Sequence, residues 1–111
     1  MASSADFRGT GVAMITPFKN DGSIDMAQLE KHIDHLISNG IDYLVVLGTT
    51  AETPTLSKRE KIDIIEVSKR VINGRVPTVV GAGGNNTSEV VSWIKEIGSA
   101  GIDAYLSVAP Y

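Results

Sequence analysis

The sequence predicts an α/β fold with a parallel sheet, in the order β-α-β-α-β-α-β. Short apolar runs alternate with segments whose apolar residues recur at helical spacing. Turn signals rich in Gly and Asn separate the two kinds of segment. The segment Ser38–Asp42 is also echoed by Ser99–Asp103, each time between a predicted helix and a predicted strand. Their offset corresponds to two β-plus-α units of about 30 residues each.

The first predicted strand is Thr10–Thr16, an apolar run that Pro17 ends. After an Asn-Asp-Gly turn, Asp25 is placed to cap a helix, with Gln28 as its capping-box partner. This helix is expected to end at Asn39-Gly40. Its apolar positions at helical spacing are Leu29, Ile33, Leu36 and Ile37.

The second predicted strand is Tyr43–Leu47, a continuous apolar run whose two faces we expect to be covered, as in a parallel sheet. A second helix is expected between a capping box of Ser57 with Glu60 and a stop at Asn73-Gly74. Its apolar stripe is expected to consist of Ile62, Ile65, Val67, Val71 and Ile72.

The third predicted strand, Thr78–Val80, opens into the Gly-rich segment Gly81–Asn86. Either Asn86 or Thr87 is placed to cap the third helix, which ends near Gly98–Gly101. The apolar positions of this helix are Val90, Val91, Ile94 and Ile97. Ala104–Val108 is the fourth predicted strand.

Two architectures fit this order: a small doubly wound sheet, or the first half of an eight-stranded barrel. Four strands alone would leave two open edges and an uncovered inner face, and the sequence stops at a strand end without a closing helix. These features favour the half-barrel. We therefore expect an N-terminal extension at residues 1–8 and the N-terminal half of a (βα)₈ barrel at residues 9–111, the rest of the domain being absent from this chain.

Composition narrows the function classes. The chain has 111 residues, of which 42% are hydrophobic and 21% charged, and its net charge is −3. This mild acidity argues against nucleic-acid and anionic-membrane partners. The absence of cysteine excludes disulfides, thiolate zinc sites and a catalytic thiol. No signal peptide or membrane span is indicated, so we expect a cytoplasmic protein. His32 and His35 lack a third ligand, and neither a metal nor a cofactor is expected.

The richest candidate site follows the second predicted strand, because ligands in parallel α/β folds lie beyond the carboxyl ends of the strands. Gly48 permits close backbone approach, while Thr49 and Thr50 offer two hydroxyls and backbone N–H groups, a cradle suited to a small carboxylate. The alternative is a capped turn leading into the next helix. Glu52 is an acid or base candidate, but we expect a solvated carboxylate.

Other conspicuous residues carry simpler interpretations. In Gly81–Asn86 the third glycine of a dinucleotide-binding motif is replaced by Asn86, so nucleotide binding is not expected. Lys58 and Lys61 are interpreted as ordinary surface charges of a helix. Trp93 is interpreted as a packing residue of the third helix.

Several motifs in this order resemble the dihydrodipicolinate synthase branch of the pyruvate-dependent class I aldolase family, which also includes N-acetylneuraminate lyase. The motifs are Gly9–Val12, Thr16–Phe18, Gly48–Glu52, Leu56-Ser57, Gly74–Pro77, Gly81–Gly83 with Asn85, and Pro110-Tyr111. The resemblance covers essentially the whole chain after its first few residues.

The resemblance implies a (βα)₈ lyase in which a lysine on a later strand forms a Schiff base with pyruvate. The enamine then adds to aspartate semialdehyde and gives 4-hydroxy-tetrahydrodipicolinate in lysine biosynthesis. Thr49 would belong to a proton relay, and Thr50 would bind the pyruvate carboxylate through its hydroxyl and N–H. Tyr111 matches the first of two adjacent tyrosines, the second of which crosses a subunit interface. A homo-oligomer, dimer or tetramer, is implied.

This chain is expected to lack the Schiff-base lysine and one relay tyrosine, so we expect residues 1–111 alone to be inactive. Two alternatives stay open. The complete protein could be an aldolase for another aldehyde, as N-acetylneuraminate lyase is. The chain could also be a non-catalytic half-barrel that dimerises through its open sheet edges.

The resemblance also implies a candidate lysine-effector site, because Asn85, Glu89 and Tyr111 match residues that bind lysine in inhibited members. Lys58 and Lys61, however, stand where those members commonly carry histidine or another neutral or acidic residue. Two additional cations would repel a cationic ligand. Inhibition by lysine is therefore not expected.

Overall fold

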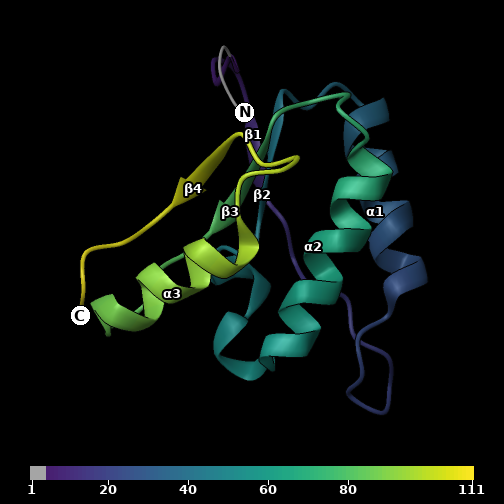
Figure 1. Ribbon diagram of the computed structural model, residues 1–111. Helices are drawn as coiled ribbons and strands as arrows, with labels where there is room; N and C mark the ends of the chain where they lie inside the picture. The colour runs from purple at the N-terminus through teal and green to yellow at the C-terminus, as the bar shows by residue number, and fades with distance from the viewer. Residues whose placement is uncertain (1–4) are drawn as a thin grey trace.

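The computed structural model describes residues 5–111, so part of the expected N-terminal extension, residues 1–4, lies outside the described residues. Four parallel strands form one sheet: β1 (Gly11–Ala13), β2 (Tyr43–Val46), β3 (Thr78–Gly81) and β4 (Ala104–Leu106). The helices between them are α1 (Met26–Ser38), α2 (Lys58–Ile72) and α3 (Thr87–Ile97) (Figure 1). Two short 3₁₀ turns, η1 (Thr49–Ala51) and η2 (Thr53–Thr55), connect β2 to α2. None of the helices in this part of the chain has the length and apolar character needed to cross a membrane.

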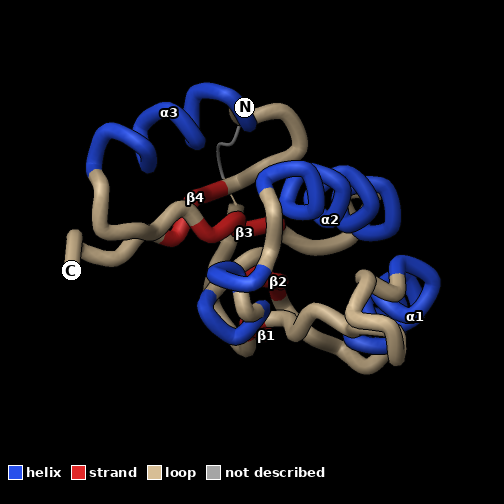
Figure 2. The backbone as a smooth tube through the Cα atoms, turned by 90° about the horizontal axis from the view of Figure 1, so that it is seen from below, coloured by secondary structure: helices blue, strands red, loops and turns tan. Residues whose placement is uncertain are grey.

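The strands lie in the order β1-β2-β3-β4, which is also their order along the chain. A doubly wound sheet reverses its strand order at a switch point, whereas a barrel adds each strand beside the previous one. Right-handed crossovers then place every helix on the same face. Figure 2 shows the three helices on one side of the curved row of strands. The predicted α/β class and element order are confirmed, and the sequential order favours the half-barrel over the doubly wound alternative.

The core lies between the sheet and its helices. Leu44, Val46 and Val80 project from the strands into this layer and are fully buried. Burying a side chain of this size stabilises the fold by about 1.5–3 kcal/mol. The helices contribute Leu29, Ile33, Ile64, Ile65 and Ile72. This packing fixes the strands, and hence the loops at their carboxyl ends.

The opposite face of the sheet is only partly covered. Along β2, Leu44 and Val46 are buried, whereas Tyr43 and Val45 on the other face are half-buried. Beyond the strand ends, Ile15 and Val108 remain about half exposed, at 52% and 47%. The prediction that both faces of Tyr43–Leu47 are covered is therefore wrong for residues 5–111. The reason is that a sequential parallel sheet places all of its helices on one side.

The N-cap residues of the three helices are among those predicted, with small differences in their hydrogen bonds. Asp25 accepts a hydrogen bond from the Gln28 backbone N–H at 3.0 Å, but within the described chain no reciprocal Gln28 side-chain bond completes a capping box. Ser57 and Glu60 form the complete box, with bonds of 3.1 and 2.8 Å. Asn86, rather than Thr87, caps α3.

The apolar stripe of α2 differs from the predicted one. Ile64 and Ser68 are buried with Ile65 and Ile72, whereas Ile62 and Val67 are only half-buried. These four buried residues lie on a single face of the helix, because Ile64 and Ile65 are adjacent and Ser68 and Ile72 follow at spacings of three to four residues. The predicted stripe therefore missed two residues that face the core: Ile64 and the small polar Ser68.

Candidate active site

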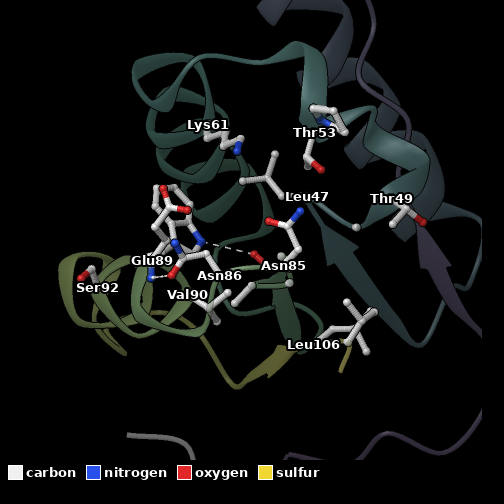
Figure 3. Close-up of a pocket in the computed structure, with 18 of the residues that line it drawn as sticks. Leu47, Thr49, Thr53, Lys61, Asn85, Asn86, Glu89, Val90, Ser92 and Leu106 are labelled. Atoms are coloured by element: carbon white, nitrogen blue, oxygen red, sulfur yellow. Dashed lines mark hydrogen bonds between the residues drawn. The ribbon is translucent and has the colours of Figure 1, made fainter. Parts of the chain in front are cut away.

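The carboxyl ends of all four strands meet at one end of the sheet, as their parallel arrangement requires. A cavity of about 700 Å³ opens there, bounded by α2 on one side and α3 on the other (Figure 3). Its lining includes Gly48 and Thr49 after β2, Lys58 and Lys61 of α2, Asn85, Glu89, Trp93 and Glu96 around α3, and Leu106, Val108 and Tyr111 at the end of the chain.

The two threonines lie on the 3₁₀ turn η1, directly after β2. The turn is closed by hydrogen bonds from the Ala51 N–H to the Gly48 carbonyl and from the Glu52 N–H to the Thr49 carbonyl, both of 3.0 Å. Gly48 and Ala51 are buried, whereas Thr49 and Thr50 are exposed. The turn thus has a buried base and presents two hydroxyls to its surroundings.

Thr49 and Thr50 differ in their relation to the cavity. Thr49 lies at its edge, apart from Asn86 and Glu89, and Asn85 lies between them (Figure 3). Thr50 is next to it in sequence but does not line the cavity. Among the described residues, neither threonine's backbone N–H donates a hydrogen bond, as expected for the first residues of a 3₁₀ turn. Two hydroxyls and two unpaired N–H donors are therefore available to an anionic group.

The backbone around η1 is unusual for non-glycine residues. Leu47 before the turn has φ +60°, and Glu52 after it has φ +61°. This left-handed conformation is uncommon outside glycine and costs about 1–3 kcal/mol when the surroundings impose it. The surroundings include Thr16, whose hydroxyl donates to the Ala51 carbonyl at 2.8 Å. The sequence places Thr16 at the carboxyl end of the first predicted strand and within the Thr16–Phe18 motif, but it gives no sign of the hydrogen bond to Ala51.

The cavity wall formed by α2 and α3 carries specific polar contacts. Lys58 of α2 forms an ion pair with Glu96 of α3 at 2.6 Å, and the Lys61 ammonium lies 5.9 Å from the centre of the Trp93 ring. The Trp93 indole N–H donates to the Gly81 carbonyl at 3.3 Å. Lys58 is a surface charge as predicted, with its side chain 64% exposed, but both lysines also contact α3 at the cavity wall, which the prediction did not include. Helical spacing could not reveal partners that lie on another helix.

The residues that matched the effector site also border this cavity. Glu89 lies with Asn86 at the start of α3, whereas Asn85 lies nearer to Leu47 (Figure 3), and Tyr111 lines the cavity with 82% of its surface exposed. One continuous cavity thus connects the turn with the threonines to the start of α3. Glu52 is exposed and has no side-chain partner among the described residues, in keeping with a solvated carboxylate. Within residues 5–111, no three His, Cys, Asp or Glu side chains are grouped so that they could hold a metal.

Comparisons with known proteins agree with each other. The family model described as "Dihydrodipicolinate synthetase family" matches residues 6–111. A 4-hydroxy-tetrahydrodipicolinate synthase of Parabacteroides distasonis is 54% identical over 106 residues, which are 96% of this chain and 36% of that protein. The chain therefore spans little more than a third of the length of this relative.

Solved structures of similar proteins share the fold. The dihydrodipicolinate synthase of Bacillus anthracis superposes with a TM-score of 0.91 and 41% identity, covering 96% of this chain and 37% of its own. A chloride-inhibited synthase of Acinetobacter baumannii, complexed with pyruvate, has a TM-score of 0.91 and 39% identity. The match covers 96% of this chain and 36% of that one.

Proposed function

Because this chain belongs to the dihydrodipicolinate synthetase family, we propose that it forms the N-terminal half of the barrel of a pyruvate-dependent lyase. The complete enzyme condenses pyruvate, held as a lysine Schiff base, with aspartate semialdehyde to give 4-hydroxy-tetrahydrodipicolinate. Residues 1–111 contribute the carboxylate cradle and the relay threonine. The observation that carries this proposal is the turn after β2, in which Gly48 and Ala51 are buried while Thr49 and Thr50 between them are exposed.

The proposed roles follow from the donors that each residue offers. Thr50 binds the pyruvate carboxylate through its hydroxyl and N–H, and Gly48 allows the ligand to approach the backbone. Oriented donors of this kind stabilise an anion strongly, because they need no reorganisation when it binds. Thr49, at the cavity edge, passes a proton through its hydroxyl, which both donates and accepts. The pyruvate-bound relative from Acinetobacter baumannii supports the choice of this keto acid.

The Schiff-base lysine is proposed to lie outside residues 1–111. A nucleophilic amine must be neutral, which requires desolvation or a neighbouring positive charge. Lys58 lines the cavity, but its side chain is 64% exposed and its ammonium is held in an ion pair with Glu96, so it is neither desolvated nor placed beside another positive charge. Lys61 lies over the Trp93 ring, whose π-face attracts a cation. Neither lysine is therefore suited to attack a carbonyl.

We further propose that the complete enzyme is a cytoplasmic homo-oligomer, a dimer or a tetramer. Tyr111, at the border of the cavity and 82% exposed, is available for a contact with a neighbouring subunit. Sedimentation of the complete enzyme at micromolar concentration tests this point directly, and a monomer would contradict it.

The deciding experiment is reductive trapping. The complete enzyme is incubated with pyruvate and borohydride, and the expected result is one covalent pyruvate adduct, on a lysine beyond residue 111. Turnover with aspartate semialdehyde, compared with N-acetylmannosamine as the alternative aldehyde, identifies the second substrate. The isolated chain of residues 1–111 is expected to give no adduct. An adduct on Lys58 or Lys61 would contradict the division of roles proposed above.

A further inference from the structure

Thr16 is a buried polar residue bonded to the turn that carries the proposed cradle, and the proposed reaction assigns it no part. Its side chain is 5% exposed, and its hydroxyl donates a buried hydrogen bond of 2.8 Å to the Ala51 carbonyl. The two residues are 35 positions apart in the chain. This bond therefore ties the end of the β1 segment to the turn that carries Thr49 and Thr50.

The Ala51 carbonyl needs such a donor. Within η1, the Gly48 and Thr49 carbonyls accept from the N–H groups of Ala51 and Glu52. The left-handed backbone of Glu52 then ends the turn, and Ala51 itself is only 2% exposed. A buried carbonyl without a donor is destabilising, because it loses its water and gains nothing in return. The Thr16 hydroxyl supplies the donor that the turn cannot supply for itself.

The position of Thr16 is itself fixed. Two residues earlier, the Met14 N–H donates to the Val45 carbonyl at 3.0 Å, which continues the pairing of β1 with β2. The following Pro17 restricts Thr16 to an extended backbone. The hydroxyl is thus held at the edge of the sheet, facing η1.

The start of the turn, at Leu47, is held by β3, the strand on the other side of β2 from β1. A Cβ atom at Gly81 would overlap the Leu47 carbonyl oxygen, so only glycine lets this carbonyl lie so close to β3. Leu47 adopts its left-handed backbone at this point. The turn between Leu47 and Glu52 is therefore held by β3 at its start and by Thr16 at its end.

We propose that Thr16 is a positioning residue for the pyruvate carboxylate: its hydroxyl holds η1 in the strained conformation that presents Thr49 and Thr50. Thr16 does not touch the substrate; it acts through the Ala51 carbonyl. This inference rests on the proposed function, since it assigns a purpose to the same turn. Small displacements of donors that bind a substrate have large effects on catalysis, so loss of the clamp weakens pyruvate binding.

The test compares Thr16→Val, Thr16→Ser and Thr78→Val in the complete enzyme. Valine keeps the shape but removes the donor, whereas serine keeps the hydroxyl. Thr78 is a matched control: it is also buried, at 3%, but it begins β3 at the opposite end of the sheet. Thr16→Val is expected to raise the KM for pyruvate about tenfold while the KM for aspartate semialdehyde changes less than about twofold. Thr16→Ser and Thr78→Val are expected to keep the pyruvate KM within about twofold of wild type.

An unchanged pyruvate KM in Thr16→Val would overturn the proposal, as would an equal rise in Thr78→Val, which would indicate general destabilisation. A Thr16→Ser variant as impaired as Thr16→Val would assign the role to the methyl group instead.

Amide hydrogen exchange separates this proposal from the proposed function. The Ala51 and Glu52 N–H groups close η1, so their exchange is expected to accelerate about tenfold in Thr16→Val and to stay unchanged in Thr16→Ser. If the wild-type enzyme gives no pyruvate adduct, the proposed function fails, yet exchange still decides whether Thr16 holds the turn. Unaltered exchange in Thr16→Val would overturn the clamp whether or not pyruvate is trapped.

Discussion

Asp42 and Asp103 make the same pair of hydrogen bonds at the amino ends of β2 and β4. The Asp42 carboxylate accepts from the Thr10 N–H at 2.7 Å, and the Asp42 N–H donates to the Thr10 carbonyl at 2.9 Å. The Asp103 carboxylate accepts from the Thr78 N–H at 2.8 Å, and the Asp103 N–H donates to the Thr78 carbonyl, also at 2.8 Å. The echo between Ser38–Asp42 and Ser99–Asp103 therefore corresponds to a repeated device that ties each strand to the one before it.

The first prediction concerns the stability that this device contributes. Asp103→Ala is expected to lower the free energy of unfolding by about 2 kcal/mol, because it leaves the Thr78 N–H without its partly buried acceptor. Asp42→Ala should cost about 1 kcal/mol, since its bond is exposed and water can replace the carboxylate. Urea unfolding of the complete enzyme measures both.

Asp103→Asn is the control for this prediction, because its amide oxygen can still accept from Thr78. It should be more stable than Asp103→Ala. Equal losses in Asp103→Ala and Asp103→Asn would show that charge, rather than the acceptor, is what matters at this position.

The second prediction follows from Tyr105, whose hydroxyl donates to the Gly98 carbonyl at the end of α3. Burial raises the pKa of Tyr105 above its usual value of 10.0. The folded state therefore holds the phenol proton more tightly than the unfolded state, and this contribution to stability is lost as the pH rises from about 10 through the folded pKa. Tyr105→Phe should be about 1 kcal/mol less stable than wild type at pH 8.

The same reasoning fixes how that difference depends on pH. Above pH 10 the two unfolding free energies should converge, because only the wild type has this phenol to ionise on unfolding. Urea unfolding of both proteins at pH 8 and at pH 10.5 is the measurement. A difference that grows with pH would be inconsistent with a pKa raised by burial.

The element order and most of the helix ends could be predicted from sequence because their causes are local. The Ser57–Glu60 capping box spans three residues, and Asn73 ends α2 with a left-handed backbone at φ +46°, as its Asn-Gly signal predicts. The left-handed Leu47 could not be predicted. Its cause is the close approach of its carbonyl to Gly81, a tertiary contact in a segment that otherwise has the composition of a strand.

In the candidate site, too, the features with local causes could be predicted and those with tertiary causes could not. The placement of Thr49 and Thr50 beyond β2 follows from the general rule for parallel strands. The Thr16–Ala51 bond and the Lys58–Glu96 ion pair join residues more than 30 positions apart, so no local pattern announces them. The sequence therefore predicted where the hydrogen-bond donors of Thr49 and Thr50 lie, but not the tertiary contacts around them.

The third prediction concerns lysine as an effector. We expect the complete enzyme to bind no lysine at micromolar concentration, because Lys58 already pairs with Glu96 and Lys61 shares the cavity with Glu89. A like charge about 4 Å from a bound ammonium costs about 1 kcal/mol even in water. Lys61→Gln should therefore raise the affinity for lysine about fivefold in calorimetry. Lys95→Gln, on α3 but outside the cavity lining, should leave it unchanged; micromolar binding by the wild type would contradict the prediction.

The fourth prediction separates proton transfer from binding at Thr49. Valine nearly matches threonine in shape, so Thr49→Val removes the hydroxyl at the cavity edge without removing bulk. Because a positioned proton donor contributes about 10²–10⁴-fold to a rate, kcat of the complete enzyme should fall at least about 100-fold. The pyruvate KM should change less than about threefold, since the carboxylate is assigned to Thr50. Steady-state kinetics checks both values, with Thr10→Val, at the opposite end of the sheet, as the matched substitution. A Thr49→Val enzyme with wild-type kcat would exclude this hydroxyl from the relay, and a rise in KM alone would assign Thr49 to binding instead.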